Sequence, residues 1–200
     1  YASLTFDAAW GNEDTEEPID ILPRYGGRAT FFLVGDWVEK YPESVQALSD
    51  SGMEVMNHSD THAHFASLSS AEIEADINSC SDKIEAITGV RPTLFRCPYG
   101  EYDDEVIDTV RAMGVTPIQW DVDSLDWKGL DAAQIERRVV SGVKPGSIVL
   151  FHNAAEHTPE ALPGIIESLL ADGYTLVPVS ELLLAGEYDI DHTGRMRPAA

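Results

Sequence analysis

Two histidines four residues apart, His58 and His62 in the segment NHSDTH, have the spacing of a metal-binding pair. If the chain turns helically here, both imidazoles face the same side of the turn. Two imidazoles suit zinc or a similar divalent ion, and a catalytic zinc site adds a third protein ligand and an open position for water. The spacing predicts a metal site completed by a carboxylate from another strand end. The alternative is that both are ordinary surface histidines. We expect the nearby His64 to have no role in the metal site.

Three more polar residues stand directly after apolar segments of strand length: Asp7 after SLTF, Arg96 after TLF and His152 after SIVLF. A carboxylate in such a place is often only a turn former. In a site, an imidazole with a pKa near neutrality can transfer protons. An arginine can hold a carboxylate bidentately and keep it ionised, with a surface salt bridge as the alternative.

The segment WDVDSLDWKG interleaves acids with apolar residues. Asp126 could orient Arg96 or an imidazole, and Trp127 could line a pocket. An ordinary turn with core residues is the alternative. The segment therefore counts as part of a site only if the fold brings it to the other candidates.

The elements that must position these residues alternate along the chain. Apolar segments typical of strands recur at 3–6, 29–34, 53–56, 93–95, 117–120, 147–151 and 175–178. Segments with helical spacing lie between them and begin near Thr15, Pro42, Ser69, Asp103, Asp131 and Pro159. The clearest helix has capping-box spacing at Ser69 and Glu72 and a glycine, Gly89, to close it. The alternation predicts an α/β fold with a parallel sheet wrapped by helices, either a barrel or a doubly wound sheet.

The polar residues at strand ends favour the barrel. Such residues directly follow several of the expected strands, namely Asp7, His58, Arg96, Asp121 with Asp123, and His152. In a parallel barrel all these ends open on one face, where active sites are built from several strands. Burying so many titratable or cationic groups unpaired would be costly, so we expect them to share a site.

The composition of the chain limits the number of domains and the classes of binding partner. The chain has 200 residues, 44% of them hydrophobic, which is enough for one domain with a substantial core. Its formal charge of −22, from 35 acids and 13 bases, argues against nucleic acid and against an anionic membrane surface. The apolar runs are far shorter than the roughly 20 residues of a transmembrane helix. Whether an export signal or a membrane anchor precedes Tyr1 is a question that the sequence leaves open. We expect Cys80 and Cys97 to be small buried residues of the core.

Taken in order, these segments resemble the five motifs of the NodB-homology polysaccharide deacetylases, carbohydrate esterase family four. The motifs stand here as TFDAAW, HSDTH, RCPYG, DSLDW and LFH, and the resemblance spans residues 3 to about 180. The local sequence is most similar to the cell-wall and sporulation-type bacterial deacetylases. The resemblance implies a distorted (β/α) barrel, a single domain over residues 1–200, and metal-dependent hydrolysis of an N-acetyl group on a hexosamine.

The resemblance also implies roles for single residues. Asp7 matches the catalytic base and Arg96 the residue that tethers it, while His152 matches the catalytic acid and Asp126 a supporting acid. A metal ion would polarise the amide carbonyl and lower the pKa of its water. Asp7 would take the proton of that water, and His152 would protonate the departing amine.

The remaining roles concern the ion and the substrate. His58 and His62 match the metal ligands, for a divalent ion that we expect to be zinc, with cobalt or nickel as alternatives. Trp127 and Leu150 match the walls around the acetyl methyl group, and Tyr99 of the RCPYG motif is a further substrate-binding candidate.

One position departs from the family pattern. The first motif usually carries two adjacent acids, the second of which binds the metal, and this chain has Ala8 there. The loop GNEDT returns two acids just before Thr15, a helix cap candidate, so we predict that Glu13 or Asp14 supplies the third ligand directly or through a water. The alternatives are two first-turn helix acids with no metal role, a metal held by histidines and water, or a site too weak to work.

The expected partner is an N-acetylated glycan, either peptidoglycan or a chitin-like oligomer, and the expected location is extracellular or in the cell envelope. Two other functions stay open. One is a carbohydrate-binding domain impaired in catalysis, and the other is a metal-independent amidase of the same fold. The sequence leaves the oligomeric state unknown.

Overall fold

The structure is a computed structural model that describes residues 1–199. Its centre is a sheet of seven strands: β1 (Ser3–Ala8), β2 (Thr30–Leu33), β3 (Glu54–Asn57), β4 (Leu94–Phe95), β5 (Thr116–Pro117), β6 (Val122–Asp123) and β7 (Ile148–His152). They lie in the order β5-β4-β3-β2-β1-β7-β6, and every pairing is parallel. The predicted α/β class and parallel sheet are therefore confirmed.

The sheet is curled. Its two edge strands, β5 and β6, follow each other in the chain with only residues 118–121 between them. Because the five residue steps from Pro117 to Val122 reach at most about 17 Å, the two edges must lie near each other. The sheet is thus a half-barrel, which confirms the expected distorted barrel.

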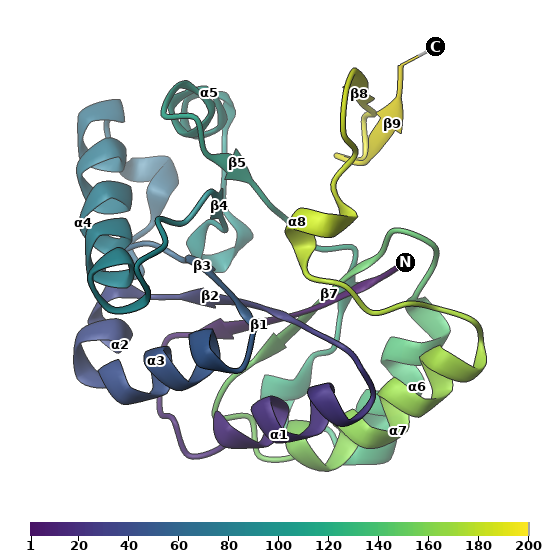
Figure 1. Ribbon diagram of the computed structural model, residues 1–200. Coiled ribbons are helices and arrows are strands. Elements are labelled where there is room, and N and C mark those ends of the chain that lie inside the picture. The colour runs from purple at the N-terminus through teal and green to yellow at the C-terminus, as the bar shows by residue number, and fades with distance from the viewer. Residues whose placement is uncertain (200) are drawn as a thin grey trace.

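Helices cover the outside of this sheet. They are α1 (Glu16–Arg24), α2 (Gly35–Lys40), α3 (Pro42–Asp50), α4 (Ser70–Thr88), α5 (Asp104–Ala112), α6 (Ala132–Gly142) and α7 (Thr158–Ala171). The short helix α8 (Val179–Leu182) instead packs Val179 against Phe32 and Met56, in a cluster separate from the core under those helices. Figure 1 shows α2, α3 and α4 beside one half of the sheet and α6 and α7 beside the other, with α1 between them. None of the helices within residues 1–199 is long and apolar enough to cross a membrane.

The ends of the helices follow their capping residues. Ser69 and Glu72 form the predicted capping box of α4, and Gly89 ends this helix with a left-handed φ of 74°. Helices α5 and α6 begin where predicted, and the side chains of Asp103 and Asp131 cap them. Thr15 precedes α1 as expected, but its side chain makes no capping hydrogen bond.

Two of the predicted strands are wrong. In the segment 117–120 only Pro117 belongs to a strand, β5, because residues 118–121 cross to the other edge of the sheet, where β6 begins at Val122. The segment 175–178 makes an isolated bridge between Leu176 and Ala2 and then enters α8, with Pro178 as its N-terminal cap residue. The helix α2 was not predicted, and a hairpin of β8 (Tyr188–Ile190) and β9 (Met196–Pro198) follows α8.

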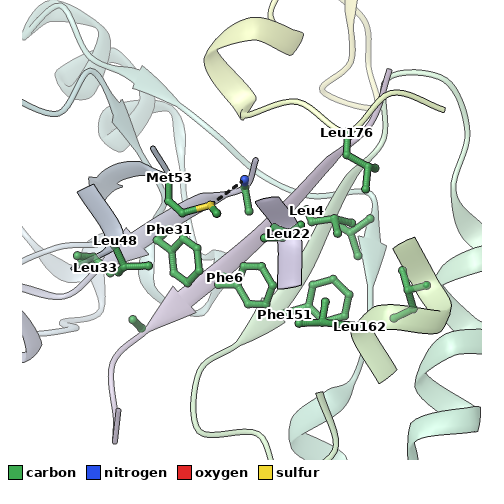
Figure 2. Packing of buried hydrophobic residues seen from close by; sticks show 14 of the residues in the cluster. Leu4, Phe6, Leu22, Phe31, Leu33, Leu48, Met53, Phe151, Leu162 and Leu176 are labelled. Carbon is green, nitrogen blue, oxygen red and sulfur yellow. Dashed lines mark hydrogen bonds between the residues drawn. The ribbon is translucent and has the colours of Figure 1, made fainter. Parts of the chain in front are cut away.

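The core between sheet and helices determines where the strand-end residues point. Phe6 of β1 stacks between Phe31 of β2 and Phe151 of β7, with ring centroids 4.8 and 5.3 Å apart (Figure 2). Successive strand residues point to opposite faces of a sheet. Asp7 and His152 follow Phe6 and Phe151 and are partners in the register of β1 and β7. Both therefore point into the curl of the sheet, away from the helices.

Candidate active site

A cavity of about 660 Å³ opens at the carboxyl ends of the strands. The sequence-predicted residues that line it are Asp7, His58, His62, Tyr99, Asp126, Trp127, Leu150 and His152. Arg96, the remaining predicted residue, is fully buried behind Asp7. The structure therefore brings these residues together at one cavity, although they come from distant parts of the chain.

Asp7 and Arg96 form a buried ion pair. The Arg96 Nη1 group donates to Asp7 Oδ1 at 2.8 Å and to the hydroxyl of Thr5 at 2.8 Å. The guanidinium also lies over the Phe32 ring, 4.2 Å from its centre, in a cation–π contact. Burial raises the pKa of Asp7, but the charges of His58, Arg96 and His152 outweigh burial and hold that pKa below its usual value. Asp7 is therefore a carboxylate at neutral pH.

His152, half-buried at the cavity, and the buried Asp126 form a second pair. His152 Nδ1 lies 2.8 Å from Asp126 Oδ1, and the backbone N–H of His152 donates to Asp126 Oδ2 at 2.8 Å. Burial lowers the pKa of His152, but the hydrogen bond and charge of Asp126 outweigh it and raise the pKa above the ordinary histidine value. The sequence allowed Asp126 to orient either Arg96 or an imidazole. In the structure it orients the imidazole of His152 and favours the protonated form of that ring.

The sequence analysis considered a helical turn at His58 and His62, but the loop that carries them is not helical. It passes through left-handed φ values of 73° at Ser59 and 59° at His62. Asn57 Oδ1 accepts from the Ser59 N–H at 2.8 Å, and the Ser59 hydroxyl accepts from the His62 N–H at 2.9 Å. This tight turn still brings the two imidazoles together, with ring centroids 5.1 Å apart.

The protonation of the two imidazoles suits a metal. Burial lowers the pKa of His58, and burial together with the His58 charge lowers the pKa of His62 to about 4. His58 Nδ1 lies 2.8 Å from the carbonyl oxygen of Arg96, which can only accept, so Nδ1 carries the hydrogen. The second nitrogen, Nε2, then presents a lone pair to the cavity. Metal-binding histidines commonly have such a donor contact on the other ring nitrogen.

That lone pair faces a negative oxygen. His58 Nε2 lies 3.4 Å from Asp7 Oδ2, and both side chains are buried. Two acceptors that face each other in a buried place repel unless a cation lies close to both. His58, His62 and Asp7 therefore fit a divalent cation. Within residues 1–199, however, no three His, Cys, Asp or Glu side chains are already gathered around one point in the manner of a complete metal site.

The structure does not place Glu13 or Asp14 as the missing ligand. The Asp14 carboxylate accepts from the N–H groups of Ala154 and Ala155, at 2.7 and 3.1 Å. Both acids line a neighbouring cavity of about 600 Å³ rather than the one that holds the histidines. Asp14 serves to tie two loops together, because its carboxylate satisfies two backbone donors of the opposite loop.

Position 8 does not face the histidines either. Ala8 is 1% exposed and belongs with Phe6 to the apolar cluster between sheet and helices. Alternation along β1 accounts for this, because Asp7 points into the curl. The second acidic position of the family motif is therefore occupied here by a small core residue.

Aromatic side chains surround the mouth of the cavity. Tyr99, Trp127 and Trp10 are 56%, 61% and 59% exposed, and all three line the cavity. The Tyr99 ring lies against His62 at 4.5 Å and stacks on His64 at 4.3 Å. Leu150, at 3% exposure, forms an apolar wall deeper inside. The mouth therefore offers apolar faces around a polar floor, a combination common in pockets that bind small ligands.

Sequence reasoning missed several residues that hold this site. The Thr5 hydroxyl accepts from Arg96 Nη1 at 2.8 Å, and the Thr158 hydroxyl donates to Asp126 Oδ2 at 2.9 Å. Asn153 accepts from the Ala9 N–H at 3.2 Å and so joins the loop after β7 to the loop after β1. The alternation of β1, which places Thr5 on the face of Asp7, is a signal that could have identified Thr5.

Asp121 does not belong to this group. The sequence placed it at the carboxyl end of a strand, but its carboxylate accepts from the Ser147 hydroxyl and the Ile148 N–H, both at 2.8 Å. These groups lie at the start of β7, the opposite end of the strand from His152. Asp121 therefore supports the sheet and not the cavity.

Comparison with known proteins gives a consistent result. The sequence model described as polysaccharide deacetylase matches residues 1–118. The peptidoglycan-N-acetylmuramic acid deacetylase PdaC of Bacillus subtilis is 39% identical over 180 residues, which are 90% of this chain and 38% of PdaC. The chain thus spans well under half of that relative.

Solved structures agree with this. A family 4 carbohydrate esterase from Streptomyces lividans, in complex with acetate, is 32% identical with a TM-score of 0.82, and the match covers 100% of this chain and 98% of that one. A CE4 family pseudoenzyme from Bacillus anthracis is 36% identical with a TM-score of 0.87, covering 90% of this chain and 64% of that one. The fold is thus shared with proteins described as an esterase and as a pseudoenzyme.

Proposed function

Because the chain belongs to the polysaccharide deacetylase family, we propose that it is a metal-dependent hydrolase that removes N-acetyl groups from a hexosamine polymer. One observation carries the proposal. A carboxylate held by Arg96 and an imidazole held by Asp126 face the same cavity as two neutral imidazoles. Amide hydrolysis needs a base, an acid and a Lewis acid at one place, and this cavity supplies the residues for all three.

The residues divide the work as follows. Asp7, ionised and tethered by Arg96, takes the proton of the attacking water. His152, whose pKa is raised by Asp126 against the opposing effect of burial, protonates the departing amine. Without that proton an amide nitrogen is a very poor leaving group.

His58 and His62 would hold a divalent ion, with zinc favoured and cobalt or nickel as alternatives. When bound, such an ion polarises the acetyl carbonyl and lowers the pKa of water. The neutral imidazoles and the lone pair that faces Asp7 support this assignment. Trp127, Leu150 and Tyr99 then form the walls around the acetyl group and its sugar.

The substrate is peptidoglycan or a chitin-like oligomer, and the place of action is outside the cell or in the envelope. The name of PdaC, a peptidoglycan-N-acetylmuramic acid deacetylase, supports the first substrate. The net charge of −22 is unsuited to nucleic acid. We propose that residues 1–200 act as one deacetylase domain.

Acetate release from defined glycans tests the proposal. The purified chain is treated with a chelator and then assayed on N-acetylglucosamine oligomers and on peptidoglycan, with zinc, cobalt or nickel added back. We expect acetate only with metal, and a loss of at least about 100-fold in His62→Ala. His64→Ala is the matched control, because His64 is exposed and stacks on Tyr99 outside the metal pair. Full activity without metal would instead indicate the metal-independent amidase.

A second function has an observation in its favour. Position 8 carries alanine, and a CE4 family pseudoenzyme shares 36% identity with the chain. A glycan-binding domain without catalysis would bind the same oligomers and release no acetate with any metal. The intact pairs of Asp7 with Arg96 and of His152 with Asp126 favour the enzyme, since a binding domain has no use for them.

A further inference from the structure

We propose that Thr158, the first residue of α7, is a positioning residue that fixes the Asp126 carboxylate against His152. The geometry stands on its own, while its effect on turnover rests on the proposed deacetylase function. Thr158 is 2% exposed and lies outside the family motifs quoted above.

Each oxygen of Asp126 has a defined partner. Oδ1 faces His152 Nδ1 at 2.8 Å. Oδ2 accepts from the His152 N–H at 2.8 Å and from the Thr158 hydroxyl at 2.9 Å. Asp126 is 4% exposed, so these protein donors, and not bulk water, determine how the carboxylate is turned.

The segment that carries Asp126 needs such support. Asp126 begins a three-residue 3₁₀ turn, η3 (Asp126–Lys128), which lies between left-handed residues at Leu125, with φ of 54°, and Gly129, with φ of 70°. A short turn between two such residues has few backbone hydrogen bonds of its own to hold it. A side-chain contact to a rigid element is then the effective way to fix the carboxylate.

Helix α7 is that rigid element. It runs for 14 residues and buries a stripe of apolar side chains, among them Leu162, Ile165, Ile166 and Leu169. Thr158 at its start directs its hydroxyl to Asp126 across the site. The hydroxyl therefore connects the proton-donating pair to the core of the protein.

Loss of the hydroxyl should loosen the pair without opening the core. In Thr158→Val the side chain keeps its size, but Oδ2 keeps only the His152 N–H and the carboxylate can rotate away from Nδ1. The charged groups that face His152 are Asp7 from β1, Asp123 from β6 and Asp126 from η3, and His58 and His62 share the cavity. Of these, Asp126 makes the direct hydrogen bond, so its misplacement should favour the neutral imidazole.

The experiment compares Thr158→Val, Thr158→Ser and Thr109→Val. Thr109 is a buried threonine of α5, on the far side of the fold from α7, and controls for a buried Thr-to-Val change. In Thr158→Val we expect kcat to fall roughly 10-fold with KM unchanged, and the alkaline limb of the pH–rate profile to move to lower pH. Thr158→Ser, which keeps the hydroxyl, should restore both, and Thr109→Val should change neither.

An NMR titration of His152 separates this proposal from the proposed function. The titration needs no substrate, and its midpoint should fall in Thr158→Val and recover in Thr158→Ser. If the midpoint moves as expected but the wild type releases no acetate, the positioning role holds and the deacetylase function fails. An unchanged midpoint and pH limb in Thr158→Val, or a Thr158→Ser variant as impaired as the valine variant, would overturn the positioning role.

Discussion

The two sides of the cavity are built in different ways. The proposed proton-transfer side pairs Asp7 of β1 with Arg96, which follows β4, and His152 of β7 with Asp126 of η3, and a hydrogen bond of 2.8 Å joins each pair. The metal side, His58 and His62, stands on an irregular loop after β3. The first side is fixed by hydrogen bonds among protein groups, whereas the second leaves a lone pair and a carboxylate oxygen 3.4 Å apart.

The difference shows which part of the chemistry depends on something outside the chain. On the proposed proton-transfer side each carboxylate has a cationic partner within the fold, although Asp7 Oδ2 also faces the metal side. The metal side becomes favourable only when a cation relieves the facing acceptors. Changes on the first side should therefore act on turnover or folding, and changes on the second should act on metal binding.

The largest expected effect lies on the proton-transfer side. His152→Ala should lower turnover by about 10²–10⁴-fold, because the amine then leaves without a positioned proton donor. Metal content and glycan binding should stay near those of the wild type, since His152 belongs to the other pair. Acetate release and elemental analysis check this, with His192→Ala, an exposed histidine, as control. Near wild-type turnover would remove His152 from the mechanism.

Arg96→Met tests whether the Asp7 pair is part of the fold. Removing the guanidinium leaves a buried carboxylate unpaired, so we expect a loss of about 3–5 kcal/mol in the free energy of unfolding at neutral pH. Arg111→Met, on an exposed part of α5, should cost less than about 0.5 kcal/mol. Urea unfolding of both variants measures the difference.

The same pair predicts the direction of the pH dependence of stability. Although burial opposes it, the folded-state pKa of Asp7 is lowered by His58, Arg96 and His152. Its contribution is therefore present above the unfolded pKa and is lost as the pH falls through the folded value. The stability gap between wild type and Arg96→Met should shrink on acidification, and a constant gap would contradict the assignment.

The pH–rate profile sharpens the comparison further. In the proposed mechanism His152 acts as an acid only while protonated, and Asp126 raises its pKa against the opposing effect of burial. The alkaline limb should therefore lie above the ordinary histidine pKa of about 6.5. Asp126→Asn removes the charge and should move that limb down by about one pH unit or more. A limb that stays in place in Asp126→Asn would assign it to another group.

The smallest expected effect on metal concerns the loop acids. Glu13→Ala and Asp14→Ala should each change zinc affinity by less than about twofold, because both acids line the neighbouring cavity. Asp14→Ala should instead cost about 1 kcal/mol of stability, since two N–H groups lose their acceptor. Calorimetry and urea unfolding measure the two quantities. A tenfold loss of zinc affinity in either variant would contradict this expectation and identify the substituted acid as a metal ligand.

The sequence predicted the fold class and most of the residues that meet at the cavity, because strand ends and helix caps are local signals. Apolar runs ended at Asp7, Arg96 and His152, and the parallel sheet brings such ends to one face. The capping box at Ser69 likewise needs only residues close in sequence.

What the sequence could not supply depends on contacts between distant segments. The hydrogen bonds from the Ala154 and Ala155 N–H groups to Asp14 form only because the fold brings two loops together. The crossing of residues 118–121 from one sheet edge to the other depends on how far the sheet curls. The support of Asp126 by Thr158 joins residues 32 positions apart.

Zinc binding to the metal-free protein, measured by calorimetry, tests the comparison most directly. The account predicts one ion per chain in the wild type, loss of binding in His58→Ala and in His62→Ala, and affinity within about twofold of wild type in His152→Ala and His64→Ala. Circular dichroism verifies that each variant is folded. A folded wild type that binds no zinc, or zinc affinity that survives loss of both His58 and His62, would contradict the assignment of the metal to these two imidazoles.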